Sequence, residues 1–195
     1  MLKKQFFVCL IAVLGFLQLG TATAALVSFS PSSQSVAEGD NVSVDLRISG
    51  LGDDILAGFD LNISFDDSIL GFQSFTFGTG LDLFGFGSIQ DVDDFLPGLV
   101  NVAEISFESD DDLKALQPND FILGTFTFSA LSIGTSALSI TAPLFGGALV
   151  GENASELDMQ VQDGSVSVVP IPAAIWLFGT GLIGLLGYSK RRKAA

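Results

Sequence analysis

The chain of 195 residues contains no histidine and only one cysteine, Cys9. Without histidine there is no Ser-His-Asp or Cys-His catalytic unit and no histidine-ligated zinc or iron site. P-loop and dinucleotide-binding glycine motifs are absent as well. A glycoside hydrolase needs only two carboxylates, so this activity stays a remote alternative, although no spacing singles out a pair. We therefore expect a protein that is not an enzyme and that has no cofactor.

Basic residues are scarce between the two ends of the chain. The sequence has 8 Lys and Arg residues against 22 Asp and Glu residues, and only Arg47 and Lys114 lie in the acidic part between Glu38 and Asp163. Two positive and 22 negative charges give this part a net charge of −20. A domain with this charge repels nucleic acid and anionic lipid, which excludes nucleic-acid binding.

Tryptophan and tyrosine each occur once, and both lie in the C-terminal tail. Sugar-binding sites usually stack their ligands on exposed Trp or Tyr rings, so only Phe is available for that purpose here. Phe84, Phe86 and Phe95 fall in segment 78–98, whose Gly, Phe and Asp content predicts a long loop or a loosely paired hairpin. These three residues are candidates for a ligand-binding loop, and the alternative is an apolar flap that closes one end of the domain.

The N-terminus has the layout of a secretory signal peptide. Lys3 and Lys4 precede an apolar run over residues 6–19, and the small residues Ala22 and Ala24 stand at the −3 and −1 positions of a cleavage site. The run is shorter than the ~20 residues of a membrane-spanning helix, which disfavours a permanent anchor. Residues 1–24 are predicted to be removed by signal peptidase after Ala24. Cys9 would leave with them.

The C-terminus predicts a membrane segment. Residues 171–188 carry no charge, and at about 1.5 Å per residue they are long enough for a minimal transmembrane helix. A basic cluster follows at once: Lys190, Arg191, Arg192 and Lys193. By the positive-inside rule this cluster stays in the cytoplasm, which places the acidic part outside.

A short motif precedes and enters this segment. Its residues are Val169, Pro170, Ile171, Pro172, Ala173 and Ala174, followed by Ile-Trp-Leu-Phe-Gly-Thr-Gly-Leu. The stretch 169–195 resembles a PEP-CTERM sorting signal, although Ile171 stands where the name-giving form has Glu. The resemblance implies a Gram-negative source and processing near residues 170–172 by an exosortase. It further implies an inner-membrane intermediate, followed by transfer to the cell surface or release, often alongside exopolysaccharide.

Between the two ends the apolar residues alternate with period two. The pattern runs through 42–48 and 59–65, weakly through 99–107, then through 122–128 and 166–168. This alternation predicts half-buried antiparallel strands. Asp163-Gly164 predicts a hairpin turn, and Asp111–Leu116 predicts at most one short helical turn. We predict an all-β, two-sheet antiparallel jelly-roll sandwich of about eight or nine strands over residues 25–168.

The order of these strand segments resembles a cohesin-type domain, which is related to some carbohydrate-binding modules. The segments that carry the resemblance are 35–44, 57–70, 124–128 and 162–168. The resemblance implies a non-catalytic module that binds a protein partner or a polysaccharide of the extracellular matrix. The alternative is a structural acidic protein that hydrates the matrix and bridges it through divalent cations.

Two acidic clusters are candidates for calcium. Asp91, Asp93 and Asp94 form one cluster and residues 110–112 form the other, and both are predicted to lie in loops. Their oxygen ligands suit calcium, but neither cluster has the spacing of an EF-hand. A solvated acidic loop is the simpler interpretation, so calcium binding is retained here as a hypothesis about Asp91, Asp93 and Asp94.

Overall fold

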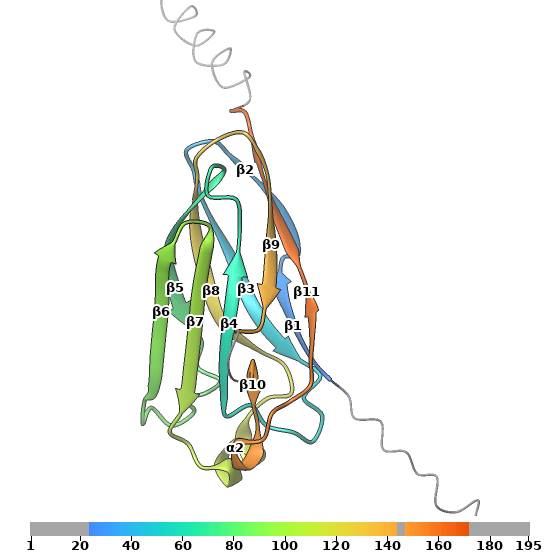
Figure 1. Cartoon of the computed structure of the whole chain (residues 1–195). Coiled ribbons are helices and arrows are strands. Elements are labelled where there is room, and N and C mark those ends of the chain that lie inside the picture. Colours follow the sequence, from blue (N-terminus) through green and yellow to red (C-terminus); the bar gives the residue numbers. More distant parts are fainter. Residues whose placement is uncertain (1–23, 144–146, 172–195) are drawn as a thin grey trace, which may run out of the picture.

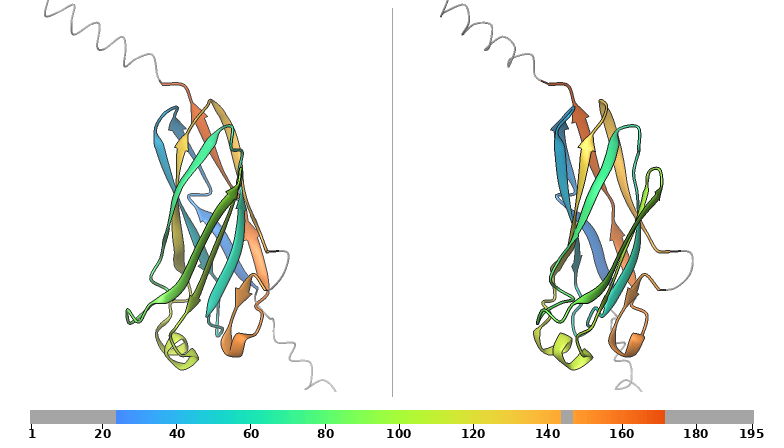
Figure 2. Two further views of the ribbon diagram at one scale, coloured as in Figure 1. Left: turned by 60° about the vertical axis from the view of Figure 1, so that its left-hand side comes forward. Right: turned by 90° about the vertical axis from the view of Figure 1, so that its left-hand side faces the viewer.

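The computed structural model describes residues 24–143 and 147–171, which form a β-sandwich of two sheets (Figure 1, Figure 2). One sheet has five strands in the order β11-β1-β3-β8-β5. The other has seven: six in the order β2-β12-β9-β4-β7-β6, and the short β10, which pairs with β4. The strands are Ala25–Ser30 (β1), Ser33–Ala37 (β2), Asn41–Ser49 (β3), Gly58–Ser64 (β4), Leu70–Phe77 (β5), Ser88–Leu96 (β6), Leu99–Ser106 (β7), Phe121–Ala130 (β8), Gly134–Thr141 (β9), Leu149–Val150 (β10), Met159–Gln162 (β11) and Gly164–Val169 (β12).

The predicted fold class, an all-β sandwich of two sheets, is confirmed. In β3 the four apolar side chains of residues 42–48 are buried, and the residues between them are less so. Phe59, Leu61 and Ile63 of β4 are buried in the same way, while Phe65 is only partly buried against the core. Because both sheets turn one apolar face inward, a single core lies between them.

Phe126 of β8 lies at the centre of this core and is completely buried. Its ring centroid lies 4.5 Å from that of Phe75, 5.8 Å from Phe128, 6.3 Å from Phe72 and 6.4 Å from Phe29. Such aromatic pairs contribute about 0.5–1.5 kcal/mol each beyond the area that they bury. This cluster joins β1, β5 and β8, and it holds the five-stranded sheet together without a disulfide.

The alternation in β8 is interrupted near its start. The sequence pattern places Ile122 on the buried face, but the structure leaves Ile122 partly exposed and buries Leu123. The register with β3 shifts between Leu46, which lies opposite Gly124, and Arg47, which lies opposite Ile122. The extra residue forms a bulge, and a bulge exchanges the inward and outward faces on one side of it.

The predicted hairpin at Asp163-Gly164 is wrong. β11 pairs in parallel with β1 in the five-stranded sheet, whereas β12 pairs with β9 and β2 in the other sheet. The chain crosses between the sheets at this point, and Asp163 Oδ1 accepts a hydrogen bond from the Ile140 N–H (2.9 Å). A Cβ on Gly164 would lie 3.0 Å from Phe29, so the glycine allows a close approach between strands rather than a tight turn.

The described residues contain twelve strands instead of the predicted eight or nine. The alternating stretches correspond to β3, β4, β7, β8 and β12, while the short β2, β10 and β11 have little alternation of their own. The sequence pattern also underestimates segment 78–98, because residues 88–96 form the full-length strand β6 and only residues 78–87 form a loop. Most pairings are antiparallel as predicted, but β1 with β11 and β2 with β12 are parallel.

Helical structure is minor. α2 spans Asp110–Leu116, close to the predicted single turn at Asp111–Leu116, and its N-cap Ser109 Oγ accepts a hydrogen bond from the Asp112 N–H (3.2 Å). A 3-10 helix, η1, spans Glu152–Ala154. The ion pair between Lys114 of α2 and Glu152 of η1 (3.0 Å) connects the two.

The described chain enters and leaves the sandwich at opposite ends. β1 begins at the end that carries α2, and β12 finishes at the far end (Figure 1). Within residues 24–143 and 147–171, none of the helices has the length and apolar character needed to cross a bilayer. The predicted signal peptide, the transmembrane segment beyond Ile171 and the basic cluster at 190–193 lie outside the described residues.

Candidate binding surface

The hairpin of β6 and β7 lies at the edge of the seven-stranded sheet (Figure 1). It carries an exposed apolar surface. Val100 and Val102 of β7 point into the core, so Ile105, at the opposite phase of the strand, faces outward. The register places Ile89 of β6 directly opposite Ile105. The two side chains are 56 % and 55 % exposed. Since β6 is the last strand of its sheet, no described strand pairs with its outer edge, while on the other side Gly58 of β4, which has no side chain, lies opposite Ile105.

Three phenylalanines extend this surface at the end of the hairpin near α2. Phe84 and Phe86 lie in the loop before β6, with their ring centroids 5.8 Å apart, and Phe86 is 72 % exposed. Phe107 follows β7 and lies next to Gly87, because a Cβ on Gly87 would be 4.0 Å from the Phe107 ring. We call Phe84, Phe86, Ile89, Ile105 and Phe107 the apolar cluster.

Side-chain carboxylates, two of them buried, hold the loop and the start of β6 in place. The Phe84 N–H donates to Glu108 Oε1 (2.9 Å), and the Gly87 N–H donates to Asp82 Oδ1 (2.9 Å). Glu104, on the inward face of β7 and 1 % exposed, accepts hydrogen bonds from Ser88 Oγ (2.6 Å) and Gln90 Nε2 (2.9 Å). The loop is therefore bonded to Glu108, just after β7, and the start of β6 is bonded to Glu104 of β7, which presents the apolar cluster in one arrangement.

The other end of the hairpin carries a smaller site around Phe95, whose ring is 88 % exposed. A shallow cavity of about 160 Å³ lies beside it, lined by Asn62, Asp93, Phe95, Leu96, Leu99 and Asn101. Asn101 Nδ2 donates to Asp60 Oδ1 (2.7 Å) and Asn62 Oδ1 (3.0 Å), and this orients both amides. The Phe95 N–H donates to Asp93 Oδ1 (3.0 Å).

The surface between the two ends is acidic. Asp91 and Asp93 of β6 lie opposite Ala103 and Asn101, and so face outward like Ile105. The described residues contain two basic side chains, and neither belongs to β6 or β7. Lys114 is paired with Glu152, whose hydrogen bond raises the pKa of the Lys114 ammonium. Arg47 belongs to β3 of the other sheet. A partner that fits this face would present apolar side chains together with Lys or Arg.

The structure places the predicted site residues as follows. Phe84 and Phe86 are brought together, while Phe95 lies at the opposite end of β6. None of the three rings closes the core, because all three are exposed. In the loop before β6 the buried apolar side chain is Leu81. Val169 ends β12, where it pairs with Ala37, so the sorting motif begins where the sheet stops.

The predicted acidic loops are not loops. Asp91, Asp93 and Asp94 lie within strand β6, and Asp110, Asp111 and Asp112 form the first turn of α2. In residues 24–143 and 147–171, no three His, Cys, Asp or Glu side chains gather in a way that could hold a metal ion. The described geometry gives calcium binding at Asp91, Asp93 and Asp94 no support, and it stays a hypothesis from the sequence.

Ile89, Ile105 and Phe107 were not predicted from the sequence to belong to a binding surface. A signal was present in β7, where Glu104 occupies the phase of the buried valines and Ile105 occupies the outward phase. An apolar residue out of phase with its strand indicates an exposed contact surface. That phase was hard to assign, since an inward glutamate and an outward isoleucine both obscure the alternation.

Comparison with known proteins matches residues 27–168 to the cohesin domain. No curated protein matches the chain. Among solved structures, the sixth cohesin from the scaffoldin B of Acetivibrio cellulolyticus, in complex with a Cel5 dockerin, is similar with a TM-score of 0.61 and 16 % identity. That match covers 75 % of this chain and 100 % of the other.

Cohesins from other settings are similar too. CaCohA2 from Clostridium acetobutylicum matches with a TM-score of 0.57 and 20 % identity, over 76 % of this chain and 92 % of its own. A non-cellulosomal cohesin from the archaeon Archaeoglobus fulgidus matches with a TM-score of 0.56 and 13 % identity, over 75 % and 92 %. At these identities the solved structures establish the fold that this chain shares with them.

Proposed function

Because the match over residues 27–168 shows that the chain belongs to the cohesin family, we propose that it is an exported binding module that attaches a partner protein through its β6–β7 face. The family consists of non-catalytic binding modules, which agrees with the absence of histidine. The partner would contact the apolar cluster and the acidic surface beside it. A dockerin-type module is the first candidate, since the Acetivibrio cohesin is described in complex with one.

The observation that carries this proposal is the exposure of the apolar cluster on a rigid support. Large exposed apolar residues that are contiguous and bordered by polar ones mark interaction sites on soluble domains. Aromatic side chains in particular supply the few contacts that dominate protein interfaces. The hydrogen bonds from Phe84 to Glu108 and from Ser88 to Glu104 order the loop and the start of β6 in advance, so little conformational entropy is lost on binding.

The experiment is a capture from the producer's extracellular matrix with residues 25–171 immobilised, followed by identification of the retained protein and titration with it. Ile105→Asp should reduce retention of that protein at least tenfold. Ile133→Asp is the matched control, because Ile133 is equally exposed (56 %) but lies in the turn between β8 and β9. Equal retention by both variants would contradict the proposed surface.

The same capture separates the remaining functions. Binding that survives raised salt and chelator indicates a specific partner, whereas binding lost under both conditions indicates an acidic matrix protein that acts through divalent-cation bridging. Protease digestion of the matrix should abolish binding if the partner is a protein. Binding that persists after digestion would favour an exopolysaccharide ligand.

Polysaccharide is a second candidate because of the Phe95 site. An unstacked aromatic ring beside oriented amides suits a pyranose, whose apolar face stacks on the ring while its hydroxyl groups bond the amides. In these two amides Asn101 Nδ2 already donates to Asn62 Oδ1. The other two atoms, Asn101 Oδ1 and Asn62 Nδ2, are left for bonds to a sugar. Phe95→Ala should then weaken binding to digested matrix, whereas Ile105→Asp should not.

Export and surface attachment complete the proposal. Signal peptidase would cleave after Ala24, and an exosortase would process the chain near Pro170–Pro172. The end of β12 at Val169 supports this, since Pro170 and Ile171 follow the last residue of the sheet and are exposed. Replacing Pro170 and Pro172 by Ala should leave the protein in the membrane fraction. Normal release of that variant would refute the sorting step.

A further inference from the structure

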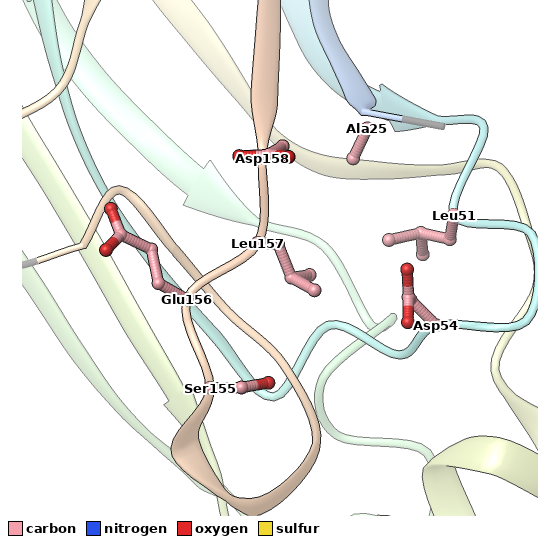
Figure 3. Close-up of a pocket in the computed structure, with 7 residues that line it drawn as sticks. All are labelled: Ala25, Leu51, Asp54, Ser155, Glu156, Leu157 and Asp158. Atoms are coloured by element: carbon pink, nitrogen blue, oxygen red, sulfur yellow. The ribbon is translucent and has the colours of Figure 1, made fainter. Parts of the chain in front are cut away.

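A cavity of about 270 Å³ lies where β1 begins, on residues that belong to neither β6 nor β7 (Figure 3). Leu51 and Leu157 form its apolar part, and the rest of the lining comes from Ala25, Asp54, Ser155, Glu156 and Asp158. Three of these side chains are carboxylates. Asp54 comes from the connection between β3 and β4, while Glu156 and Asp158 come from the segment before β11.

Ala25 is the first residue of β1 and is only 3 % exposed. Its backbone N–H donates to the Asp158 carbonyl oxygen (2.9 Å), and its parallel partner in β11 is Met159. The first residues of most domains are poorly ordered. Here β1 is paired and buried from Ala25 onward, and Ala25 would be the first residue of the chain after the predicted signal cleavage.

We propose that this cavity binds the α-ammonium group of the mature chain. The proposal rests on the cleavage after Ala24 put forward above. Hydrolysis of the Ala24–Ala25 peptide bond adds one water: the new carboxylate remains on Ala24, and the nitrogen of Ala25 becomes an amine that is protonated near neutral pH. Folding then brings this cation to the cavity that Ala25 lines, where Figure 3 shows Asp158 across from Ala25 and Asp54 beside Leu51.

The charge and the hydrogen bonds of the site suit an ammonium group. An amide nitrogen has one hydrogen, which already bonds the Asp158 carbonyl oxygen. An ammonium has three, so two more become available for the cavity. No lysine or arginine among the described residues lines it, and the three carboxylates that do are without a cation there. The three carboxylates are solvent-exposed, and a negative charge close to the ammonium favours its protonated form.

The test compares two forms of residues 25–171, a segment that contains the whole cohesin module. One form begins at Ala25, released from a cleavable fusion that leaves no extra residue, and the other keeps Thr23 and Ala24. The first should melt about 2–4 °C higher at pH 6.5. A raised pKa in the folded state gives stability that is complete below the ordinary amine pKa of about 8 and is lost above it. The difference should therefore disappear by about pH 10.

Two side-chain variants assign the effect. Asp54→Asn with Asp158→Asn should abolish the difference between the two forms, whereas Asp53→Asn, an exposed neighbour outside the cavity, should keep it. Equal melting temperatures at pH 6.5, or a difference that is unchanged at pH 10, would overturn the proposal. The N-terminal mass of the exported protein tests the cleavage separately: a start other than Ala25 refutes the cleavage, while the melting comparison still decides whether the cavity prefers an ammonium.

Discussion

Strands β8 and β6 place phenylalanine in opposite environments. Phe126 of β8 is fully buried and has four aromatic neighbours, while Phe95 of β6 is almost fully exposed and has none among the described residues. β8 lies between β3 and β5 and faces the opposite sheet, whereas β6 is an edge strand. The comparison teaches that strand position, rather than residue type, separates side chains that stabilise this domain from those available to a partner.

The largest expected effect comes from the buried ring. Phe126→Ala should lower the free energy of unfolding by about 3–5 kcal/mol, because it removes the residue on which the rings of β1, β5 and β8 converge. The matched change Phe95→Ala should stay within about 0.5 kcal/mol. Urea unfolding of both variants measures the difference. Similar losses for the two would show that the Phe95 ring is packed rather than exposed.

The bulge in β8 gives a sharper comparison between adjacent residues. Leu123→Ala should cost about 2–5 kcal/mol, because it opens a cavity in the core. Ile122→Ala should cost less than about 1 kcal/mol, since Ile122 is partly exposed. Thermal unfolding by circular dichroism measures both. A larger loss for Ile122→Ala than for Leu123→Ala would contradict the bulge and favour the regular alternation of the sequence.

The acidic middle of the hairpin face should act on the rate of binding. Asp91→Asn with Asp93→Asn is expected to slow association with the captured partner about two- to tenfold at low salt and to reduce its salt dependence. Glu38→Gln, in the exposed turn after β2, is the control. Stopped-flow or surface-binding kinetics give the rates. An unchanged rate with a faster dissociation would instead indicate direct contact by these carboxylates.

The smallest effect concerns Asp66, outside both regions. The Ser68 hydroxyl and the Ser68 N–H bond its Oδ1 (2.6 and 3.0 Å), and these bonds lower the pKa of Asp66 below its ordinary value. A lowered folded-state pKa gives stability that is present above the ordinary value near 3.8 and is lost as the pH falls through the lower one. Ser68→Ala should raise the pKa, as NMR titration would show. No upward shift would contradict these hydrogen bonds.

Strand β3 of the five-stranded sheet could be predicted in full. In β3 each residue of 42–48 alternates cleanly, so the buried face follows from the period alone. β6 could not be recognised in this way, because Asp91, Asp93 and Asp94 stand in a strand that is exposed along its length. Its formation depends on the pairing with β7. The same holds for Asp163-Gly164, where a local turn signal is overridden by β12 pairing with β9 and β2.

The candidate site shows the same division. Phe84, Phe86 and Phe95 could be selected from the sequence, because aromatic residues in a Gly-rich acidic segment are conspicuous. Ile89, Ile105 and Phe107 could not, since only the β6–β7 register brings Ile89 to Ile105 and Gly87 to Phe107. The sequence also separates Phe95 from Phe86 by few residues, and the length of an extended strand moves them to opposite ends of the hairpin.

Four properties can be read from the sequence: the sandwich class, the acidic charge, the absence of histidine chemistry and the residues of the two predicted processing signals. These follow from composition and local period, which need no knowledge of distant residues. The tertiary structure alone decided which apolar side chains stay outside, where β8 bulges, and that Ala25 lies beside Asp54 and Asp158. Each of these depends on pairing between strands far apart in the chain, and that pairing is set by the burial of the whole core rather than by any local segment.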